Sequence, residues 1–263
     1  HLPDITVVTP VFDRKGEAVI ITVASRAHHA DIGGVSPGSM PASSQSIEDE
    51  GILFDNVALV KDGEFQERKI RAILNRQPYP ARNADQNIED LKAQIAANTK
   101  GVREIEKLVE RFGLRVVHAY MNHIKANARE CVQDAIAKLN EGHSTIELDG
   151  GERICVNISI DRDERTAIVD FSGTSPTSSG NFNAPGSIAR AAVLYAFRTQ
   201  VRNRIPLNAG CMEPIAIRLP ESSLVDPCYP AAVVAGNVET SQCITDALLA
   251  ALNVCAAAQG TMN

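Results

Sequence analysis

The sequence predicts a mixed α+β fold, with β-hairpins and short sheet segments around a central helical pair. Short β-branched runs lie in the first and last thirds of the chain, next to turn residues. The middle instead carries apolar residues at helical spacing. Because strands and helices do not alternate regularly, a doubly wound sheet is not expected. The 263 residues are 44% hydrophobic, which is enough to bury a sizeable core.

Two strands are expected near the beginning of the chain. Residues 5–8 form a short β-branched run, and residues 18–24 (AVIITVA) form a second one. The second run is apolar on both faces, which favours an interior strand. Residues 13–16 (DRKG) fit a hairpin connection between the two. A loop rich in Gly, Ser and Pro follows over residues 33–51, and ordered loops of this length are often functional.

The middle of the chain predicts two helices. Apolar residues recur at helical spacing between residues 88 and 112, and Gly113 ends this helix. A second helix is expected over residues 114–139. Its apolar side carries Val117, Tyr120, Met121, Ile124 and Ala128. We expect the two helices to pack as an antiparallel pair.

The last part of the chain predicts a hairpin followed by mixed elements. A turn joins strands over residues 153–160 and 166–171. The later elements are a helix over 188–201, strands over 215–219 and 231–235, and a final helix from about residue 240. The chain therefore has three expected regions. They are a strand-rich region (1–87), the helical pair (88–145) and a mixed α/β region (146–263).

The composition argues against nucleic acids and membranes as partners. The formal net charge is −6, and the basic residues are scattered rather than clustered. Trp is absent and aromatic residues make up only 4%, so a base-stacking surface is not expected. The longest apolar stretch, residues 244–258, is interrupted by Asp246 and Asn253 and is too short to span a bilayer.

The cysteine spacing and the absence of nucleotide-binding motifs indicate the cellular compartment and the expected ligands. None of the six cysteines forms a CxxC pair, so we expect reduced thiols in a cytoplasmic protein. Neither a P-loop nor a strand followed by G-x-G-x-x-G occurs, so ATP is not expected to bind here by those routes. Because the chain starts at His1, directly before a strand, we expect it to be a fragment of a longer protein.

Two clusters of His and Asp flank the first predicted hairpin. In residues 1–4 (HLPD), Pro3 favours a turn, which would bring His1 and Asp4 together. In residues 28–34 (HHADIGG), the polar residues follow a buried strand and end at a glycine pair. A hairpin would bring Asp4 and Asp31 to one end, where His nitrogens and carboxylates could hold a metal ion. The alternative is an ordinary surface turn and a polar strand end.

Three polar, glycine-containing loops lie next to strands or helix starts. They cover residues 170–175 (DFSGTS), 181–185 (NFNAP) and 236–241 (GNVETS). Glu239 and Thr240 are expected where a helix start presents free N–H groups to an anion or amide. Asn and Ser are also common turn formers, so each loop alone has an ordinary structural explanation.

Six motifs together resemble the B-type half of the hydantoinase/5-oxoprolinase family. In order along the chain they are HLPDITVVTP (1–10), SRAHHADIGG (25–34), DLKAQIAAN (90–98), DFSGTS (170–175), NFNAP (181–185) and GNVETS (236–241). Each motif alone is weak, but the set is highly specific and runs essentially end to end. Within the family the resemblance is closest to ATP-dependent 5-oxoprolinases. It implies one larger hydantoinase-B-type domain, truncated here at both ends.

The resemblance implies a reaction divided between two parts. An A-type half, actin- and kinase-like and either fused or separate, uses ATP to phosphorylate a lactam carbonyl oxygen. The B-type half then adds water to the activated 5-oxoproline- or hydantoin-like ring and releases the open amino acid. ATP is therefore expected to bind the partner half and not this segment. The segment alone is expected to be inactive, and an oligomer is expected.

The resemblance also assigns candidate residues. It implies a divalent metal ion (Mn, Zn or Fe) at His1, Asp4 and Asp31. His29 is the catalytic candidate, acting in proton transfer or in support of the metal ligands. The candidate substrate-binding residues are Asn181, Asn183, Asn237 and Glu239.

Two other functions remain open from the sequence. The chain also resembles the large subunit of acetone- or acetophenone-type carboxylases, which use a related phosphorylated intermediate. A non-catalytic subunit that docks an A-type partner is the third possibility. That last function predicts no bound metal and tolerance of Asp31→Ala.

Overall fold

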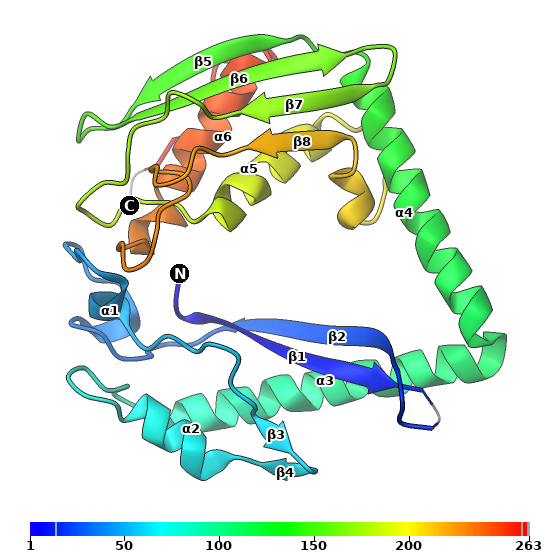
Figure 1. The fold of residues 1–263 in the computed structure, drawn as a ribbon, viewed down its shortest axis with the longest axis vertical. Coiled ribbons are helices and arrows are strands. Elements are labelled where there is room, and N and C mark those ends of the chain that lie inside the picture. Colours follow the sequence, from blue (N-terminus) through cyan, green and yellow to red (C-terminus); the bar gives the residue numbers. More distant parts are fainter. Residues whose placement is uncertain (14, 259, 262–263) are drawn as a thin grey trace. The chain divides into compact units, whose positions relative to one another are not determined.

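The computed structural model describes residues 1–13, 15–258 and 260–261 and confirms the mixed α+β class (Figure 1). The chain forms two compact units, His1–Val117 and His118–Asn263. The boundary falls within the predicted helical region 88–145.

The first unit is built around a β-hairpin. Strands β1 (Asp4–Phe12) and β2 (Val19–His28) pair antiparallel, with Asp4 opposite His28. The side chains of Ile5, Val7 and Val11 point to one face and are buried, whereas Val8 and Phe12 are exposed on the other face. The prediction of an interior strand over 18–24 was wrong, because β2 belongs to a two-stranded sheet and alternates between exposed and half-buried positions.

Helix α3 (Ala84–Phe112) covers the inner face of this hairpin (Figure 1). A row of buried amide side chains joins them. Gln94 Nε2 donates to the carbonyl oxygens of Ile5 (2.9 Å) and Ser25 (3.3 Å), and Asn98 Nδ2 donates to that of Val7 (3.0 Å). The row works because residues separated by about one helical turn, or a multiple of it, share a face. It satisfies strand carbonyls that are cut off from water.

The rest of the first unit surrounds this pair with short elements. They are the 3-10 helix η1 (Pro37–Ser39), α1 (Ile47–Glu50), β3 (Val60–Lys61), β4 (Glu64–Phe65) and α2 (Glu67–Leu74). Helix α1 begins with a capping box in which Ser46 and Asp49 satisfy each other's backbone N–H groups. The apolar core of the unit includes Ile32, Ile70, Leu74, Ile88 and Leu91. The long 33–51 loop is therefore partly helical.

The second unit is a four-stranded sheet with helices on one face (Figure 1). The strands are β5 (Gly142–Glu147), β6 (Arg153–Asp161), β7 (Thr166–Asp170) and β8 (Ile215–Arg218), in that order. Only the β7–β8 pair is parallel. The other elements are α4 (Leu114–Ile136), which begins at the unit boundary, α5 (Gly186–Thr199), η2 (Ala209–Cys211), η3 (Val234–Gly236) and α6 (Thr240–Ala251). Phe171, Phe197 and Leu248 lie in the core between them.

Three sequence expectations change in the structure. The two long helices were expected to pair with each other, but α3 packs on the hairpin and α2. Residues 231–235 were expected as a strand, but Val234–Gly236 form a 3-10 turn that leads into α6. Strand β5 was not predicted, because Ile146 is the one large apolar residue among its six positions and gives no visible alternation. The hairpin at β6–β7 and the last two helices are confirmed.

The helices in the described parts of the chain are also informative about membranes. None of them combines the length and the apolar character that crossing a bilayer requires.

Replacing Gln94 by Leu tests the amide row. The substitution keeps the side chain large but removes the buried amide that donates to the carbonyls of Ile5 and Ser25 and leaves His29 Nε2 without its acceptor, so we expect about 2–3 kcal/mol of lost stability. Chemical denaturation with the unfolding midpoint and slope measures this. Gln86→Leu makes the same change at an exposed position of α3, and we expect it to cost less than about 0.5 kcal/mol. Equal losses in the two variants would contradict the role of the row.

Candidate metal centre

Two histidines and an aspartate meet at the open end of the hairpin. His28 Nδ1 lies 3.1 Å from Asp4 Oδ1, and His1 Nδ1 lies 3.3 Å from Asp4 Oδ2. The two imidazole rings are 5.1 Å apart between centroids. The register explains the pair between strands, because Asp4 and His28 are directly opposite each other. Asp4 Oδ1 is therefore within hydrogen-bond distance of His28, and Asp4 Oδ2 is within ion-pair distance of His1.

A tight turn brings His1 to this position. The N–H of Asp4 donates to the carbonyl of His1 (3.2 Å), and the N–H of Ile5 donates to that of Pro3 (3.0 Å). The N–H of His29 also donates to the Pro3 carbonyl (2.9 Å), which ties the turn to the end of β2. The turn that Pro3 predicted is therefore present and is held from both strands.

The donor set of this cluster fits a divalent transition metal. Each of His1, Asp4 and His28 offers one ligand atom, and these atoms all lie within 4.8 Å of one another. Two imidazole nitrogens and a carboxylate oxygen suit Mn, Zn or Fe, and three protein ligands leave coordination positions open for other groups. The side chain of His1 is 5% exposed and that of His28 is 52% exposed. The cluster therefore opens to its surroundings on the His28 side.

Asp31, the third expected ligand, lies in a different set of contacts. Its Oδ1 accepts from the N–H groups of Gly33 (2.9 Å) and Arg82 (3.0 Å). Its Oδ2 accepts from the N–H of Gly38 and from Arg82 Nη1, both at 2.9 Å. The geometry thus brings His1 and Asp4 together but supplies His28 as the third member. Asp31 instead organises the loop that contains Gly33 and Gly34.

Both glycines of this loop approach other backbone segments closely. Gly33 and Gly34 have φ values of +90° and +91°, which residues with a Cβ rarely adopt. A Cβ on Gly34 would lie 2.7 Å from the carbonyl oxygen of Asp49. Gly34 therefore fits against α1, and Gly33 against the backbone of Tyr79, only because neither has a Cβ.

His29 points away from the cluster and into the protein. Its side chain is fully buried; Nδ1 lies 3.1 Å from Asn87 Nδ2 and Nε2 lies 3.2 Å from Gln94 Oε1. An imidazole with its proton on Nε2 satisfies both contacts, since Asn87 then donates and Gln94 accepts. Neither nitrogen is left to transfer a proton to a substrate. His29 therefore helps to hold the turn that carries His1 and Asp4. Its side chain is not placed to contact a substrate.

The four expected substrate-binding residues all lie in the second unit. Asn183 is fully buried and uses its whole amide within the loops: Oδ1 accepts from the N–H of Ser178, and Nδ2 donates to the carbonyls of Ser178, Gly180 and Ala232. Asn181 is also buried, and its carbonyl accepts from the N–H of Ala235. These two residues therefore connect the 178–183 loop to the segment before α6.

Asn237 and Glu239 lie on that segment. Asn237 lines a cavity of about 580 Å³ between α5 and α6, together with Tyr195, Ser241 and Thr245. Glu239 accepts a hydrogen bond from Thr261 (2.5 Å). Asn237 thus borders a cavity.

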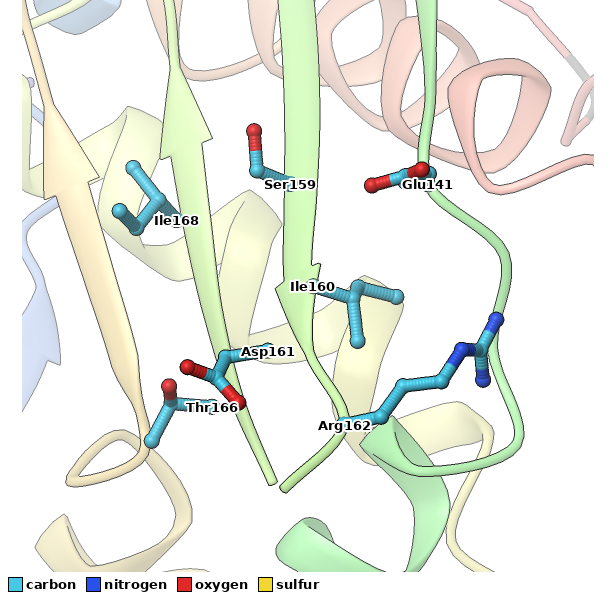
Figure 2. A pocket seen from close by; sticks show the side chains of 7 residues that line it. All are labelled: Glu141, Ser159, Ile160, Asp161, Arg162, Thr166 and Ile168. Atoms are coloured by element: carbon cyan, nitrogen blue, oxygen red, sulfur yellow. The ribbon is translucent and has the colours of Figure 1, made fainter. Parts of the chain in front are cut away.

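A second cavity in this unit, of about 570 Å³, includes Asp161 and Arg162 in its lining, and both make contacts within the protein (Figure 2). It is lined by Glu141, Ser159, Ile160, Asp161, Arg162, Thr166 and Ile168. Asp161 accepts from the backbone N–H groups of Asp163 and Glu164 and so holds the β6–β7 turn. Arg162 donates to the carbonyls of Ala137 and Leu139, beyond the end of α4. These charges stabilise turns and a helix end.

Comparison with known proteins decides the family. The family model described as hydantoinase B/oxoprolinase matches residues 1–263. The chain belongs to this family. It is 46% identical over 272 residues to a 5-oxoprolinase of Dictyostelium discoideum and 44% identical over 275 residues to one of Saccharomyces cerevisiae. Each alignment covers 100% of the chain but 21% of the relative, so the chain spans about a fifth of the length of these relatives.

Two solved structures share the fold of this hydantoinase B/oxoprolinase chain. One is the ATP-dependent caprolactamase of Pseudomonas jessenii, with a TM-score of 0.81 and 23% identity over 97% of this chain and 44% of that one. The other is a nucleotide-free acetone carboxylase, with a TM-score of 0.79 and 17% identity over 97% of this chain and 35% of that one. At these identities the likeness shows the fold alone.

The pH dependence of stability tests the role of Asp31. Burial would raise the pKa of this carboxyl, but the N–H groups of Arg82, Gly33 and Gly38 and the Arg82 side chain hold the pKa below its ordinary value of 3.8. A lowered pKa contributes stability that is complete above pH 3.8 and is lost as the pH falls through the lower folded value.

We therefore expect Asp31→Asn to cost about 2 kcal/mol near neutral pH. The difference from the unmodified protein should shrink as the pH falls from 3.8 toward the folded pKa and should be smallest below it. Thermal unfolding followed across this pH range measures it. Asp62→Asn, at an exposed turn, is the control and should follow the unmodified protein throughout. A constant Asp31→Asn difference at every pH would show that the ionised carboxylate is not what stabilises the loop.

Proposed function

We propose that this chain is the hydrolytic part of an ATP-dependent cyclic amide hydrolase. Its substrate would be an activated five-membered ring of the 5-oxoproline or hydantoin type, and its product the open amino acid. The observation that carries the proposal is the His1, Asp4 and His28 cluster, in a chain that is 46% identical to a 5-oxoprolinase. The match to the hydantoinase B/oxoprolinase model supports a hydrolase of cyclic amides.

The proposed reaction needs activation before hydrolysis. Amide resonance makes a five-membered lactam a poor electrophile, and phosphorylation turns its carbonyl oxygen into a leaving group. An A-type partner half, fused or separate, would use ATP for that step. Water then adds to the ring carbon, the ring C–N bond breaks and the nitrogen takes up a proton, which leaves a ring-opened acyl phosphate. A second water hydrolyses this acyl phosphate and releases phosphate and the open amino acid.

The residues of the cluster suit the hydrolytic step. A divalent ion bound by His1, Asp4 and His28 would supply Lewis acidity to a carbonyl or phosphoryl oxygen. Asp4 lies between the two imidazoles, so the three donor groups are already close to one another without a metal. The half-exposed His28 is the member that a substrate can approach. The buried His29 and the Pro3 turn keep these groups in place.

Metal analysis of the full-length protein tests this proposal. We expect near-stoichiometric Mn, Zn or Fe, because three ligands are already gathered at the hairpin. Asp4→Ala and His28→Ala should lose the metal together with lactam hydrolysis. Asp31→Asn should keep the metal, since Asp31 bonds to Arg82 and the glycine loop. Elemental analysis and product assays on the same samples provide both readouts.

Two controls make the result decisive. His123→Ala removes an exposed histidine from α4 and should change neither metal nor activity. ATP turnover by the A-type half should persist in the ligand variants, which shows that the complex is intact. A metal-free protein with full lactam hydrolysis would reject the metal centre. A metal-free protein that only docks the A-type half would favour a non-catalytic role, and bicarbonate-dependent carboxylation would favour a carboxylase.

A further inference from the structure

The outer edge of β1 is an open strand edge. Pro10 has no N–H and lies opposite Thr22, so this pair cannot exchange backbone hydrogen bonds across the hairpin. Because hydrogen-bonded and non-hydrogen-bonded pairs alternate, Thr6 and Val8 also direct their N–H and C=O groups away from β2. Within the described residues, no other element donates to or accepts from the backbone of Thr6 or Val8.

A groove runs along this edge. It has a volume of about 800 Å³, and six consecutive residues of β1, Ile5–Pro10, line one wall. Side chains alternate between the faces of a strand, so a wall made by consecutive residues is the strand's edge. Residues 54–60 also line the groove. At about 3.3 Å per residue, the wall from Ile5 to Pro10 is about 20 Å long, which matches an ordinary strand.

Helix α3 already provides a floor for a third strand. Gln94 and Asn98 lie under the hairpin and bind its carbonyls. The neighbouring row, Leu91, Ile95 and Thr99, lines the groove instead. These rows are adjacent on the helix surface, so α3 is wide enough to support β1, β2 and one more strand beside β1. Phe54 and Leu59 add apolar surface on the far side.

We propose that the β1 edge binds an extended segment of the same polypeptide that lies outside residues 1–263. The chain spans 21% of its 5-oxoprolinase relatives and 44% of the caprolactamase chain whose fold it shares, so such proteins contain abundant further sequence. A two-stranded hairpin is marginal by itself, and a third strand provides the missing backbone partners. The segment pairs with Thr6 and Val8 and places alternate side chains on the half-buried Ile95 and the exposed Thr99. This proposal is independent of the hydrolytic function.

Amide hydrogen exchange in the full-length protein tests the added strand. We expect the N–H groups of Thr6 and Val8 to exchange about tenfold or more slowly than those of Ala24 and Arg26. Ala24 and Arg26 lie opposite Val8 and Thr6 and form the matched outer edge of β2. Similar fast exchange at the two edges would overturn the proposal. Protection that appears only at high concentration, or only after the A-type half is added, would assign the edge to a second copy or to that partner and would also overturn it.

A pair of proline substitutions provides a second test. Val8→Pro removes a donor from the outer edge without touching the bonds to β2, as Pro10 already does. Ala24→Pro makes the same change on the edge of β2. In the full-length protein we expect Val8→Pro to lower the melting temperature and to speed proteolysis outside residues 1–263, and Ala24→Pro to have a much smaller effect. Equal effects of the two variants would argue against a strand on β1.

Discussion

The row of buried amides on α3 is the interaction on which the first unit depends. A two-stranded hairpin cannot bury enough surface to be stable alone, and its carbonyls need partners wherever water is excluded. Gln94 and Asn98 supply those partners from the helix, and Asn87 extends the row to the carbonyl of Asp31. The helix therefore fixes where the hairpin ends, and the cluster of His1, Asp4 and His28 is located at that end.

The adjacent histidines show how one strand serves both the core and the cluster. Side chains at the end of β2 alternate, so His28 faces Asp4 while His29 faces α3. The His29 side chain connects to Asn87 and Gln94, and its backbone N–H connects to Pro3. Displacing His29 would therefore move the turn that carries His1 and Asp4. Asp31, two residues after His29, also has a structural role. Its carboxylate holds the glycine loop through four hydrogen bonds.

The sequence predicted the hairpin, both long helices and the meeting of His1 with Asp4, because these depend on local periodicity and a proline turn. It did not predict His28 as the third member, since that choice depends on the register of β1 against β2. It also missed the amide row. The signal was present as polar residues at positions 87, 94 and 98 within an apolar helical stripe. The 231–235 run leads into a 3-10 turn at Val234–Gly236, where Gly236 packs so closely on the Asn183 carbonyl that a Cβ would lie 2.2 Å from it, a contact that sequence periodicity does not reveal.

The cluster of His1, Asp4 and His28 and the open edge both depend on β1, so what restrains this strand affects both. Asp4 begins β1, and Thr6 and Val8 follow within it, so the backbone that positions the carboxylate is the backbone that lacks an outer partner. Ligand geometry tolerates little displacement, whereas an unpaired strand edge moves more freely than a paired one. On the inner side the α3 amides already restrain β1 through the carbonyls of Ile5 and Val7. A strand added on the outer side would restrain β1 from the opposite side as well. Binding of that strand would therefore complete the sheet and at the same time hold Asp4 in place.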